Sequence, residues 1–267
     1  MVGKGDNMDK FKHSHKLGQN FLNNSAILIK IIDCVDVNED DLVIEIGPGQ
    51  GALTKYLKLY KSNLICFEVD ERLKKYLNKF EDEKTNIIFE DFMNVDLSNV
   101  IKGVKYNKLY IMANLPYYIT TPIIEKVIDS KVDVEAMVLM VQREVADRLS
   151  AKPGRKEYGA ITAYLNYFYK VEKIIDVNRK NFTPVPNVDS AVIRLTKVNR
   201  EIKATDLGKL KTLIYDSFKM KRKNIKNNLS NYDIETFMEI FEKYGIKISD
   251  RAENIPIECF IEMANKI

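Results

Sequence analysis

The sequence contains no tryptophan, only two histidines and only three cysteines among its 267 residues. Both histidines, His13 and His15, lie in a polar N-terminal segment, where surface positions are more typical than catalytic ones. Cys34, Cys66 and Cys259 are odd in number and far apart along the chain. They therefore predict neither a disulfide framework nor a metal site. The composition argues against chemistry based on histidine or on a metal ion.

Long hydrophobic runs are absent as well. No stretch of about 18 apolar residues occurs, and the first thirty residues are polar and charged. We therefore expect neither a membrane span nor a signal peptide, and we expect a cytoplasmic protein. With 45% apolar residues the chain can still build a sizeable core, which suits one large domain and a small one.

The excess of positive charge is small, +4 at pH 7, but it is unevenly distributed. Residues 197–229 carry ten Lys and Arg against three acids, whereas residues 230–267 carry four against eight. In the densest part, Phe218, Ile225 and Leu229 recur at helical spacing, which predicts a basic helix with one buried side. Such a helix is either a nucleic-acid contact or a solvated lysine-rich surface. Its candidate RNA-binding residues are Lys219, Lys221, Arg222, Lys223 and Lys226.

A second basic segment, residues 152–159, has the composition of an exposed and flexible loop. It contains a proline and two glycines, which favour turns over regular structure. Arg155 and Lys156 in this segment are candidate contacts to RNA phosphate, and a solvated turn is the alternative.

Between residues 42 and 141, apolar runs of strand length alternate with helical patterns. Such alternation is the signature of a parallel sheet covered by helices on both faces. A later pair of strands, at residues 164–169 and 188–195, is expected to complete the sheet. The expected strands are 42–46, 63–67, 86–89, 109–112 and 136–141, and the expected helices are 52–59 and 72–80.

The pattern changes after residue 196 to lysine-rich helical periodicity without strand runs. Helices are expected there at residues 207–218 and 234–244. The sequence therefore predicts an α/β fold, with a Rossmann-like doubly wound sheet over residues 1–196 and a small C-terminal helical domain over residues 197–267. The small domain carries the basic segment and is the expected RNA-binding or ribosome-binding part.

A glycine-rich turn, Glu45-Ile-Gly47-Pro-Gly49-Gln-Gly51-Ala52, directly follows the first expected strand. An open parallel sheet binds nucleotide-like ligands at this point, and glycines allow the backbone to approach them closely. Gly47, Gly49 and Ala52 satisfy the dinucleotide pattern G-x-G-x-x-A. Gly47, Gly49 and Gly51 satisfy G-x-G-x-G, which is associated with S-adenosylmethionine. The glycines alone leave both cofactors open.

Acidic side chains follow the next two expected strands. Glu68 is placed where a carboxylate would accept both ribose hydroxyls of either cofactor, or else it is a solvated strand-end acid. Asp70 lies on the same side by strand alternation and is a candidate helper. Asp91 is placed to accept a hydrogen bond from an adenine amino group, and a helix cap is the alternative. Glu68 and Asp91 thus predict a ribose and adenine subsite.

The fourth expected strand ends abruptly in Asn114-Leu115-Pro116-Tyr117. The Asn114 side-chain oxygen and a backbone carbonyl give such a turn two acceptors for an exocyclic amine, and the Tyr117 ring can lie flat against a planar base. This combination suits methylation of an adenine amino group, whereas an ordinary strand-to-helix turn is the alternative. The sequence shows no proton relay suited to nicotinamide chemistry, which favours S-adenosylmethionine.

Five motifs in order carry a resemblance to the small-subunit ribosomal RNA adenine N6,N6-dimethyltransferases, from about residue 14 to the end of the chain. The basic stretch at 218–229 also resembles the C-terminal helix of that family. Richness in Lys, Ile and Glu without Trp is typical of thermophiles, and an archaeal member is expected. The motifs are LGQNFL at 17–22, EIGPGQGALT at 45–54, NLPYYITTP at 114–122, QREVADRL at 142–149 and FTPVPNVDSA at 182–191.

The resemblance implies the fold of the class I S-adenosylmethionine-dependent methyltransferases, with that cofactor. At the target, Asn114 and the carbonyl of Leu115 or Pro116 would accept from the adenine amine. Tyr117 and Phe182 would sandwich the base, although Phe182 without its motif fits a core aromatic in a proline-stiffened loop. The implied cofactor residues are Asn20 and Leu22 as a cover, Gly47, Gly49 and Gly51 under the amino-acid end, Glu68 at the ribose, Asp91 at the adenine, and Asn114.

The implied activity is dimethylation of the N6 amine of two adjacent adenosines near the 3′ end of 16S rRNA, during biogenesis of the small subunit. The implied enzyme is a monomer that requires neither a metal nor a membrane. A large-subunit rRNA adenine N6-methyltransferase of the antibiotic-resistance type is one alternative, because it has a similar Asn-x-Pro-Tyr turn. A mainly non-catalytic assembly or transcription factor on the same scaffold is the other.

Overall fold

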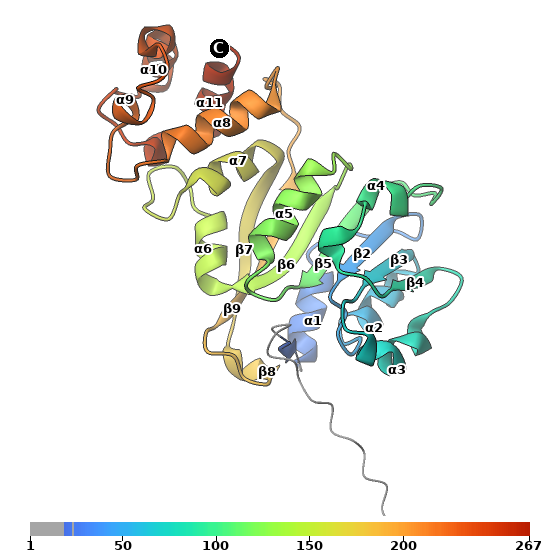
Figure 1. Cartoon of the computed structure of the whole chain (residues 1–267). Coiled ribbons are helices and arrows are strands. Elements are labelled where there is room, and N and C mark those ends of the chain that lie inside the picture. Colours follow the sequence, from blue (N-terminus) through green and yellow to red (C-terminus); the bar gives the residue numbers. More distant parts are fainter. Residues whose placement is uncertain (1–18, 23) are drawn as a thin grey trace, which may run out of the picture.

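The computed structural model describes residues 19–22 and 24–267. His13, His15 and the first two residues of the LGQNFL motif lie outside the described residues. Strands and helices alternate as far as residue 197, and the elements that follow are helices (Figure 1). The strands are β1 (Phe21–Leu22), β2 (Leu42–Ile46), β3 (Asn63–Phe67), β4 (Thr85–Ile88), β5 (Leu109–Asn114), β6 (Ala136–Gln142), β7 (Tyr169–Val177), β8 (Phe182–Thr183) and β9 (Ser190–Lys197).

The helices divide into α-helices and short 3₁₀ turns that extend or precede them. The α-helices are α1 (Ser25–Ile32), α2 (Thr54–Leu57), α3 (Lys74–Leu77), α4 (Leu97–Val100), α5 (Thr120–Asp129), α6 (Arg143–Leu149), α7 (Ala160–Phe168), α8 (Leu207–Ser217), α9 (Ile225–Asn228), α10 (Met238–Tyr244) and α11 (Ile257–Ala264). The 3₁₀ helices are η2 (Lys58–Tyr60), η3 (Glu71–Leu73), η4 (Asn78–Phe80), η5 (Phe92–Asn94), η6 (Arg179–Asn181), η7 (Ile234–Phe237) and η8 (Ala252–Asn254).

Seven strands form one sheet in the order β4-β3-β2-β5-β6-β9-β7. The five strands from β4 to β6 are parallel, whereas β9 runs antiparallel to both β6 and β7. The chain leaves β2 toward β3 on one side and later returns to β5 on the other. This reversal of strand order creates a crevice at the carboxyl ends of β2 and β5. The predicted α/β doubly wound fold is confirmed.

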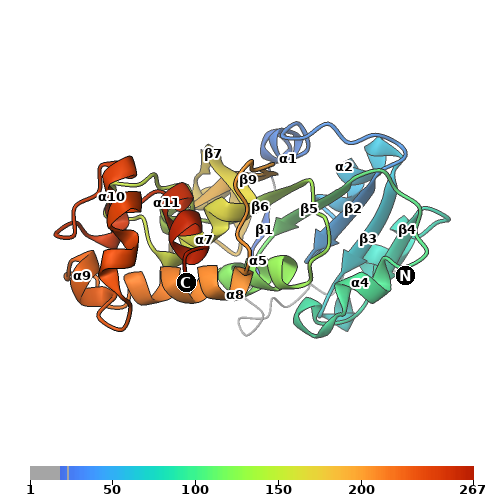
Figure 2. The same cartoon turned by 90° about the horizontal axis from the view of Figure 1, so that it is seen from above.

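The sheet has an apolar core on each face, because alternate residues of each strand point to opposite sides. Ile44 and Ile111 belong to one core, with α5, and Val43 and Met112 belong to the other, with α1. Figure 2 shows α1 and α2 on one side of the sheet and α4 and α5 on the other. The parallel strands are therefore buried on both faces, which explains their almost continuous apolar sequences.

The expected strand at residues 164–169 is wrong, since residues 160–168 form the helix α7 and β7 begins only at Tyr169. A short aromatic run cannot be assigned to helix or strand by periodicity alone. Here helical spacing brings the rings of Tyr164 and Phe168 into an edge-to-face contact, with centroids 5.3 Å apart. The partner strand β9, expected at residues 188–195, begins two residues later than predicted.

The single basic helix expected around residues 219–226 is also wrong. Helix α8 ends at Ser217, a turn follows, and the short helix α9 begins at Ile225. Asparagine side chains favour this break, because the Asn224 side chain accepts from the Asn227 amide and Asn228 accepts from the Met220 amide. The apolar positions behave as the spacing predicted, since Ile225 and Leu229 are fully buried.

The C-terminal helices pack directly on the sheet domain. Leu210, Phe237 and Phe260 belong to the same continuous apolar core as α5 and α7. The Arg200 guanidinium joins the two parts by donating to the backbone carbonyl of Tyr167 and to the carboxylate of Glu258. The boundary at residue 196 stays a prediction, because one core spans both parts. None of the helices in the described ranges is long and apolar enough to cross a membrane.

Candidate active site

A cavity opens at the carboxyl ends of β2, β3 and β5, at the crevice that the strand order creates. Together with the space at its open mouth it measures about 1370 Å³. The predicted residues that line it are Asn20, Leu22, Gly47, Gly49, Glu68, Asp91, Asn114, Leu115, Pro116 and Tyr117.

The glycine turn after β2 forms one wall of the cavity. Gly47 and Gly49 have φ angles of 72° and 61°, in the left-handed region that favours glycine. A Cβ on Gly49 would approach the Phe21 ring to 2.7 Å, so a larger residue there would displace the strand that covers the cavity. Gly51 does not line the cavity; a Cβ there would come within 2.2 Å of the Phe80 ring. The left-handed backbone of Gly51, with a φ angle of 85°, and its packing against Phe80 both favour glycine at this third position.

Glu68 follows β3 directly and is 5% exposed. Its carboxylate accepts from the Gly49 amide at 3.0 Å and from the Asp70 amide at 2.9 Å. Burial raises the pKa of Glu68, and these two backbone donors oppose the rise. Each oxygen keeps a lone pair for a further donor, so the carboxylate can accept a pair of hydroxyls from a ligand in the cavity.

Asp70 and Asp91 differ in their surroundings. Asp70 does not line the cavity; it pairs with Arg72 at 2.6 Å and accepts from the Gln19 amide at 2.7 Å. The bond from Arg72 lowers the pKa of Asp70. Asp70 therefore anchors the N-terminal segment through Gln19 and lies outside the cavity lining. Asp91 caps η5 by accepting from the Met93 amide, as its alternative interpretation predicted, and it also lines the cavity.

Glu45 is a cavity residue to which the sequence assigned no role. It lies within β2, is 2% exposed, and accepts from the Thr54 hydroxyl at 2.6 Å. Burial raises its pKa to about 7, while the bonds from Thr54 and from the Cys66 thiol lower it. An acidic residue inside the apolar run Leu42–Ile46 was the available signal, because a buried strand rarely carries a carboxylate without a local partner.

The turn after β5 orients Asn114. Its side-chain nitrogen donates to the Asn20 carbonyl at 3.2 Å, so its oxygen is left to accept from a ligand. The Pro116 carbonyl accepts from the Ile119 amide and keeps a second lone pair, so either it or the Leu115 carbonyl can be the second acceptor. The contact with Asn20 also ties the turn to the N-terminal segment.

Tyr117 and Tyr118 contribute aromatic rings to the cavity lining, together with Phe21, Phe67 and Phe92. The Tyr117 hydroxyl is hydrogen-bonded to the Ser190 hydroxyl at 2.8 Å, and burial raises its pKa, which keeps the phenol neutral. Tyr118 is 64% exposed at the cavity mouth, and the sequence interpretation gave it no role. The sequence signal for Tyr118 was its position directly after Tyr117, as a second aromatic residue in the same turn.

Phe182 is not brought to the cavity. It lies in β8, pairs with Leu22 of β1, and is 2% exposed within an apolar core. The structure thus shows the core aromatic that was the alternative interpretation. A role in stacking on a target base would require the Phe182 side chain to leave this core.

The two predicted basic segments are brought together. The Lys221 ammonium donates to the Lys156 carbonyl at 3.1 Å, and the Gly154 amide donates to the Glu253 carbonyl at 2.7 Å. The resulting exposed cations are Arg155, Lys156, Lys219, Lys221, Arg222, Lys223 and Lys226. Segments more than sixty residues apart in the chain thus form one basic surface, which we call the basic loop pair.

Metal ligation has no candidate in the part of the chain that the structure describes. No group of three or more His, Cys, Asp and Glu side chains is placed there to hold an ion. The three cysteines are free and buried. The cavity therefore offers carboxylates, amides, backbone groups and aromatic rings as its chemical groups.

Two curated relatives cover almost the whole chain, and both are named ribosomal RNA small subunit methyltransferase A. The one from Bacillus mycoides is 38% identical over 275 residues, which is 98% of this chain and 94% of the relative. The one from Ureaplasma parvum is 39% identical over 265 residues, which is 96% of this chain and 94% of the relative. Both are bacterial, so they lend no support to the expectation of an archaeal member.

Two solved structures share the fold. A dimethyladenosine transferase from Plasmodium falciparum has a TM-score of 0.76 and 25% identity, covering 91% of this chain and 95% of its own. The 23S rRNA methyltransferase ErmE has a TM-score of 0.74 and 21% identity, covering 92% and 99%. The sequence model of the family described as ribosomal RNA adenine dimethylase matches residues 10–267. A family match of this extent, with relatives at 38% and 39% identity, shows that the chain belongs to the ribosomal RNA adenine dimethylase family.

Proposed function

We propose that this chain transfers methyl groups from S-adenosylmethionine to the N6 amines of two adjacent adenosines near the 3′ end of small-subunit rRNA. The observation that carries the proposal is the turn after β5, where Asn114 is oriented by Asn20 beside Tyr117, in the cavity that the glycine turn also lines. The names of the relatives from Bacillus mycoides and Ureaplasma parvum favour the small subunit as the substrate. The likeness to a 23S rRNA methyltransferase extends to the fold alone.

The cavity fits S-adenosylmethionine at its end near β2 and β3. Gly47 and Gly49 expose backbone where an amino-acid moiety would lie, and the Glu68 carboxylate has free acceptor sites for ribose hydroxyls. Asp91 lines the same wall at the adenine end. When bound, this cofactor supplies an electrophilic methyl group on a sulfonium. Asn20 and Leu22 of the N-terminal segment would cover it.

Asn114 and the turn that follows it would hold the target amine. Two acceptors, the Asn114 side-chain oxygen and the carbonyl of Leu115 or Pro116, would draw both amine hydrogens to one side of the base plane and so favour a pyramidal nitrogen. The nitrogen lone pair is then less delocalised into the ring and can point to the opposite side, toward the methyl group. Orientation and electrostatics provide most of the acceleration. No strong base is needed before attack, because the nitrogen loses its proton after it has become cationic.

Tyr117 would hold the target base by stacking. Its ring is positioned by the hydrogen bond between its hydroxyl and Ser190, and a neutral phenol suits contact with a flat base. Stacking on an aromatic ring is worth about 1 to 3 kcal/mol per base, which partly offsets the cost of extruding the adenosine from its neighbours.

The basic loop pair would bind rRNA backbone. Its seven cations are exposed; six of them lie on two loops that a hydrogen bond joins, and Lys226 lies in the short helix α9. Phosphate contacts of this kind fix the position of the protein on RNA without reading sequence. We infer a monomer that acts on small-subunit rRNA in the cytoplasm.

Primer-extension mapping tests the choice of substrate. Unmodified small and large ribosomal subunits are incubated separately with the protein and S-adenosylmethionine, and reverse transcription locates the modified adenosines. We expect stops at two adjacent adenosines near the 3′ end of small-subunit rRNA. Stops in large-subunit rRNA would favour the antibiotic-resistance type of enzyme. An absence of stops in both subunits would favour the non-catalytic scaffold.

A further inference from the structure

The loop between β8 and β9 exposes apolar side chains beside the active site. Val185 and Val188 are 58% and 43% exposed. We call residues 184–188, which also include Pro184 and Pro186, the rim loop. Two prolines restrict its backbone, so its valines stay presented to solvent at little entropic cost.

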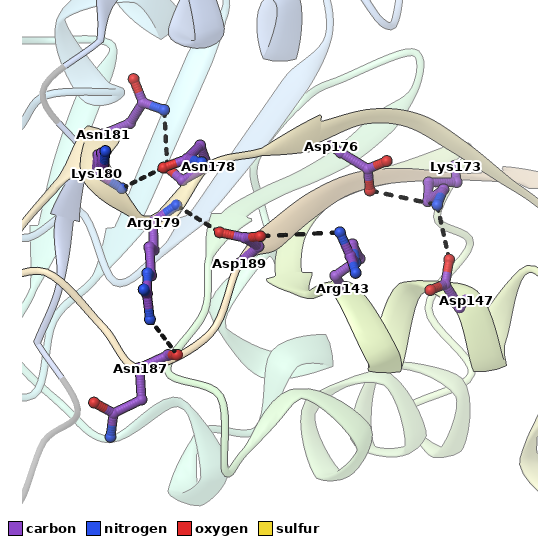
Figure 3. Close-up of polar contacts among 10 residues, drawn as sticks. All are labelled: Arg143, Asp147, Lys173, Asp176, Asn178, Arg179, Lys180, Asn181, Asn187 and Asp189. Carbon is purple, nitrogen blue, oxygen red and sulfur yellow. Dashed lines mark hydrogen bonds and ion pairs between the residues drawn. The ribbon is translucent and has the colours of Figure 1, made fainter.

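Polar contacts brace the base of the rim loop (Figure 3). The Asp189 carboxylate accepts from the Arg179 amide at 3.0 Å and lies 3.9 Å from the Arg143 guanidinium. The Arg179 guanidinium donates to the Asn187 carbonyl at 3.0 Å, and Asn178 caps η6 through the Lys180 amide. Figure 3 shows Asp189 between Arg179 and Arg143, so these contacts hold the C-terminal end of the loop.

Both ends of the rim loop also join residues of the cavity. Before the loop, β8 pairs with β1, whose Leu22 lines the cavity. After the loop, Ser190 is fully buried and is hydrogen-bonded to Tyr117. Val185 and Val188 therefore lie on a loop whose two ends are connected to residues around the place where the target base would be held.

The charges around the rim loop favour RNA as its partner. Arg143, Arg179 and Lys180 are exposed around it, against the carboxylate of Asp189 and that of Glu144, which follows Arg143 in the chain. Lys173, further along, is already neutralised by Asp147 and Asp176 (Figure 3). An apolar tip with cations at its base matches stacked bases flanked by phosphates.

We propose that the rim loop acts as a wedge, with Val185 and Val188 packing against the bases that flank the target and occupying the space that the extruded adenosine leaves. Apolar side chains inserted between base steps are a known means of unstacking nucleic acid. The proposal rests on the proposed function, because it requires an RNA target held by Tyr117.

The experiment compares two double variants of the full-length protein. V185S/V188S removes the apolar surface, whereas V185L/V188L keeps it. Single-turnover methyl transfer is measured at saturating small subunits, and extrusion is followed by the fluorescence of 2-aminopurine placed at the target position of the subunit. L59S is the matched control, since Leu59 is 69% exposed and does not line the cavity.

We expect V185S/V188S to lower the transfer rate about tenfold and to lose most of the fluorescence rise, with subunit affinity changed by no more than about twofold. V185L/V188L and L59S should behave as wild type. Unchanged transfer by V185S/V188S would overturn the wedge. So would weakened subunit binding with an intact fluorescence rise, which would indicate docking on a ribosomal protein.

Methyl transfer by the wild-type protein distinguishes a failure of the wedge from a failure of the proposed function. If wild type modifies large-subunit rRNA instead, the proposed substrate is wrong, and the same variants are compared on that RNA. If wild type transfers methyl groups to neither RNA, both proposals fail together. A melting curve for each variant shows whether it is folded, and V185L/V188L keeps the comparison valid if the serine variant is unstable.

Discussion

Asn114 is the residue on which the proposed chemistry depends most. Its side-chain nitrogen donates to the Asn20 carbonyl, and its oxygen is left to accept from a ligand in the cavity that Asn114 lines. The sequence predicted this residue from its place after an apolar strand and before a proline. The contact with Asn20 could not be predicted, because it joins positions 94 residues apart.

Replacing Asn114 by Ala should leave cofactor binding nearly intact and reduce methyl transfer by about 100-fold or more, since a preorganised acceptor for the developing charge is lost. Calorimetry with S-adenosylmethionine and single-turnover transfer to small subunits measure the two effects. Loss of cofactor binding with Asn114→Ala would assign the residue to the cofactor site alone.

Asp91 should show the opposite behaviour. Asp91→Ala removes a hydrogen-bond acceptor from the adenine end of the cavity, and cofactor affinity should fall by about 1 to 3 kcal/mol. It also removes the cap of η5, which should lower the free energy of unfolding by about 1 kcal/mol. Transfer at saturating cofactor should remain close to wild type. Asp91→Asn is the control, because it keeps a cap; unchanged cofactor affinity in both variants would exclude Asp91 from the site.

Glu45 gives a prediction for stability against pH. Burial raises its pKa to about 7 in the folded state, from 4.5. The folded protein therefore holds this proton more tightly than the unfolded chain, and the resulting stability is complete below pH 4.5 and is lost as pH rises to about 7. The free energy of unfolding is expected to fall by about 3 kcal/mol over this pH range.

Glu45→Gln should remove that part of the pH dependence, because glutamine keeps an acceptor for Thr54 and does not ionise. Urea unfolding measures the free energy of unfolding of wild type and variant at pH 5 and at pH 7.5. Titrating groups that the two proteins share cancel when the change between the two pH values is compared. An equal change in both proteins would show that Glu45 ionises normally in the folded state.

Among the elements, those with a strong apolar pattern were predicted correctly and those decided by tertiary contacts were not. The strands from β2 to β6 were predicted to within about two residues, because burial on both faces makes them continuously apolar. The aromatic run before Tyr169 fits a helix as well as a strand, and its packing on the C-terminal helices selects the helix. The break before α9 depends on asparagine contacts that spacing does not reveal.

The basic loop pair gives a prediction at the scale of elements. Replacing Lys221, Arg222 and Lys223 together by Ala should weaken binding to small subunits and reduce the slope of log affinity against log salt by about 2 to 3. Filter binding over a range of potassium chloride concentrations measures the slope. Lys102 and Lys105, exposed in the loop before β5, form the matched control. An unchanged slope in the triple variant would remove the loops from the RNA surface.

The molecule as a whole joins a sheet domain with a cofactor-sized cavity to a helical part that carries cations. The sequence predicted the fold, and it predicted most of the cavity lining because those residues follow strand ends. It placed Phe182 and Gly51 differently from the structure, since both positions are decided by side-chain packing. It gave no role to Glu45, Tyr118 or Ser190, whose contacts form only in the folded chain.

The central claim is that this cavity methylates the N6 amine of adenosines in small-subunit rRNA. The most direct measurement is to incubate the protein with labelled S-adenosylmethionine and unmodified small subunits, and then to digest the rRNA to nucleosides and separate them. We expect the label to be recovered as N6,N6-dimethyladenosine and Asn114→Ala to reduce its appearance by about 100-fold or more. Label in any other nucleoside, or no incorporation by the wild-type protein, would contradict it.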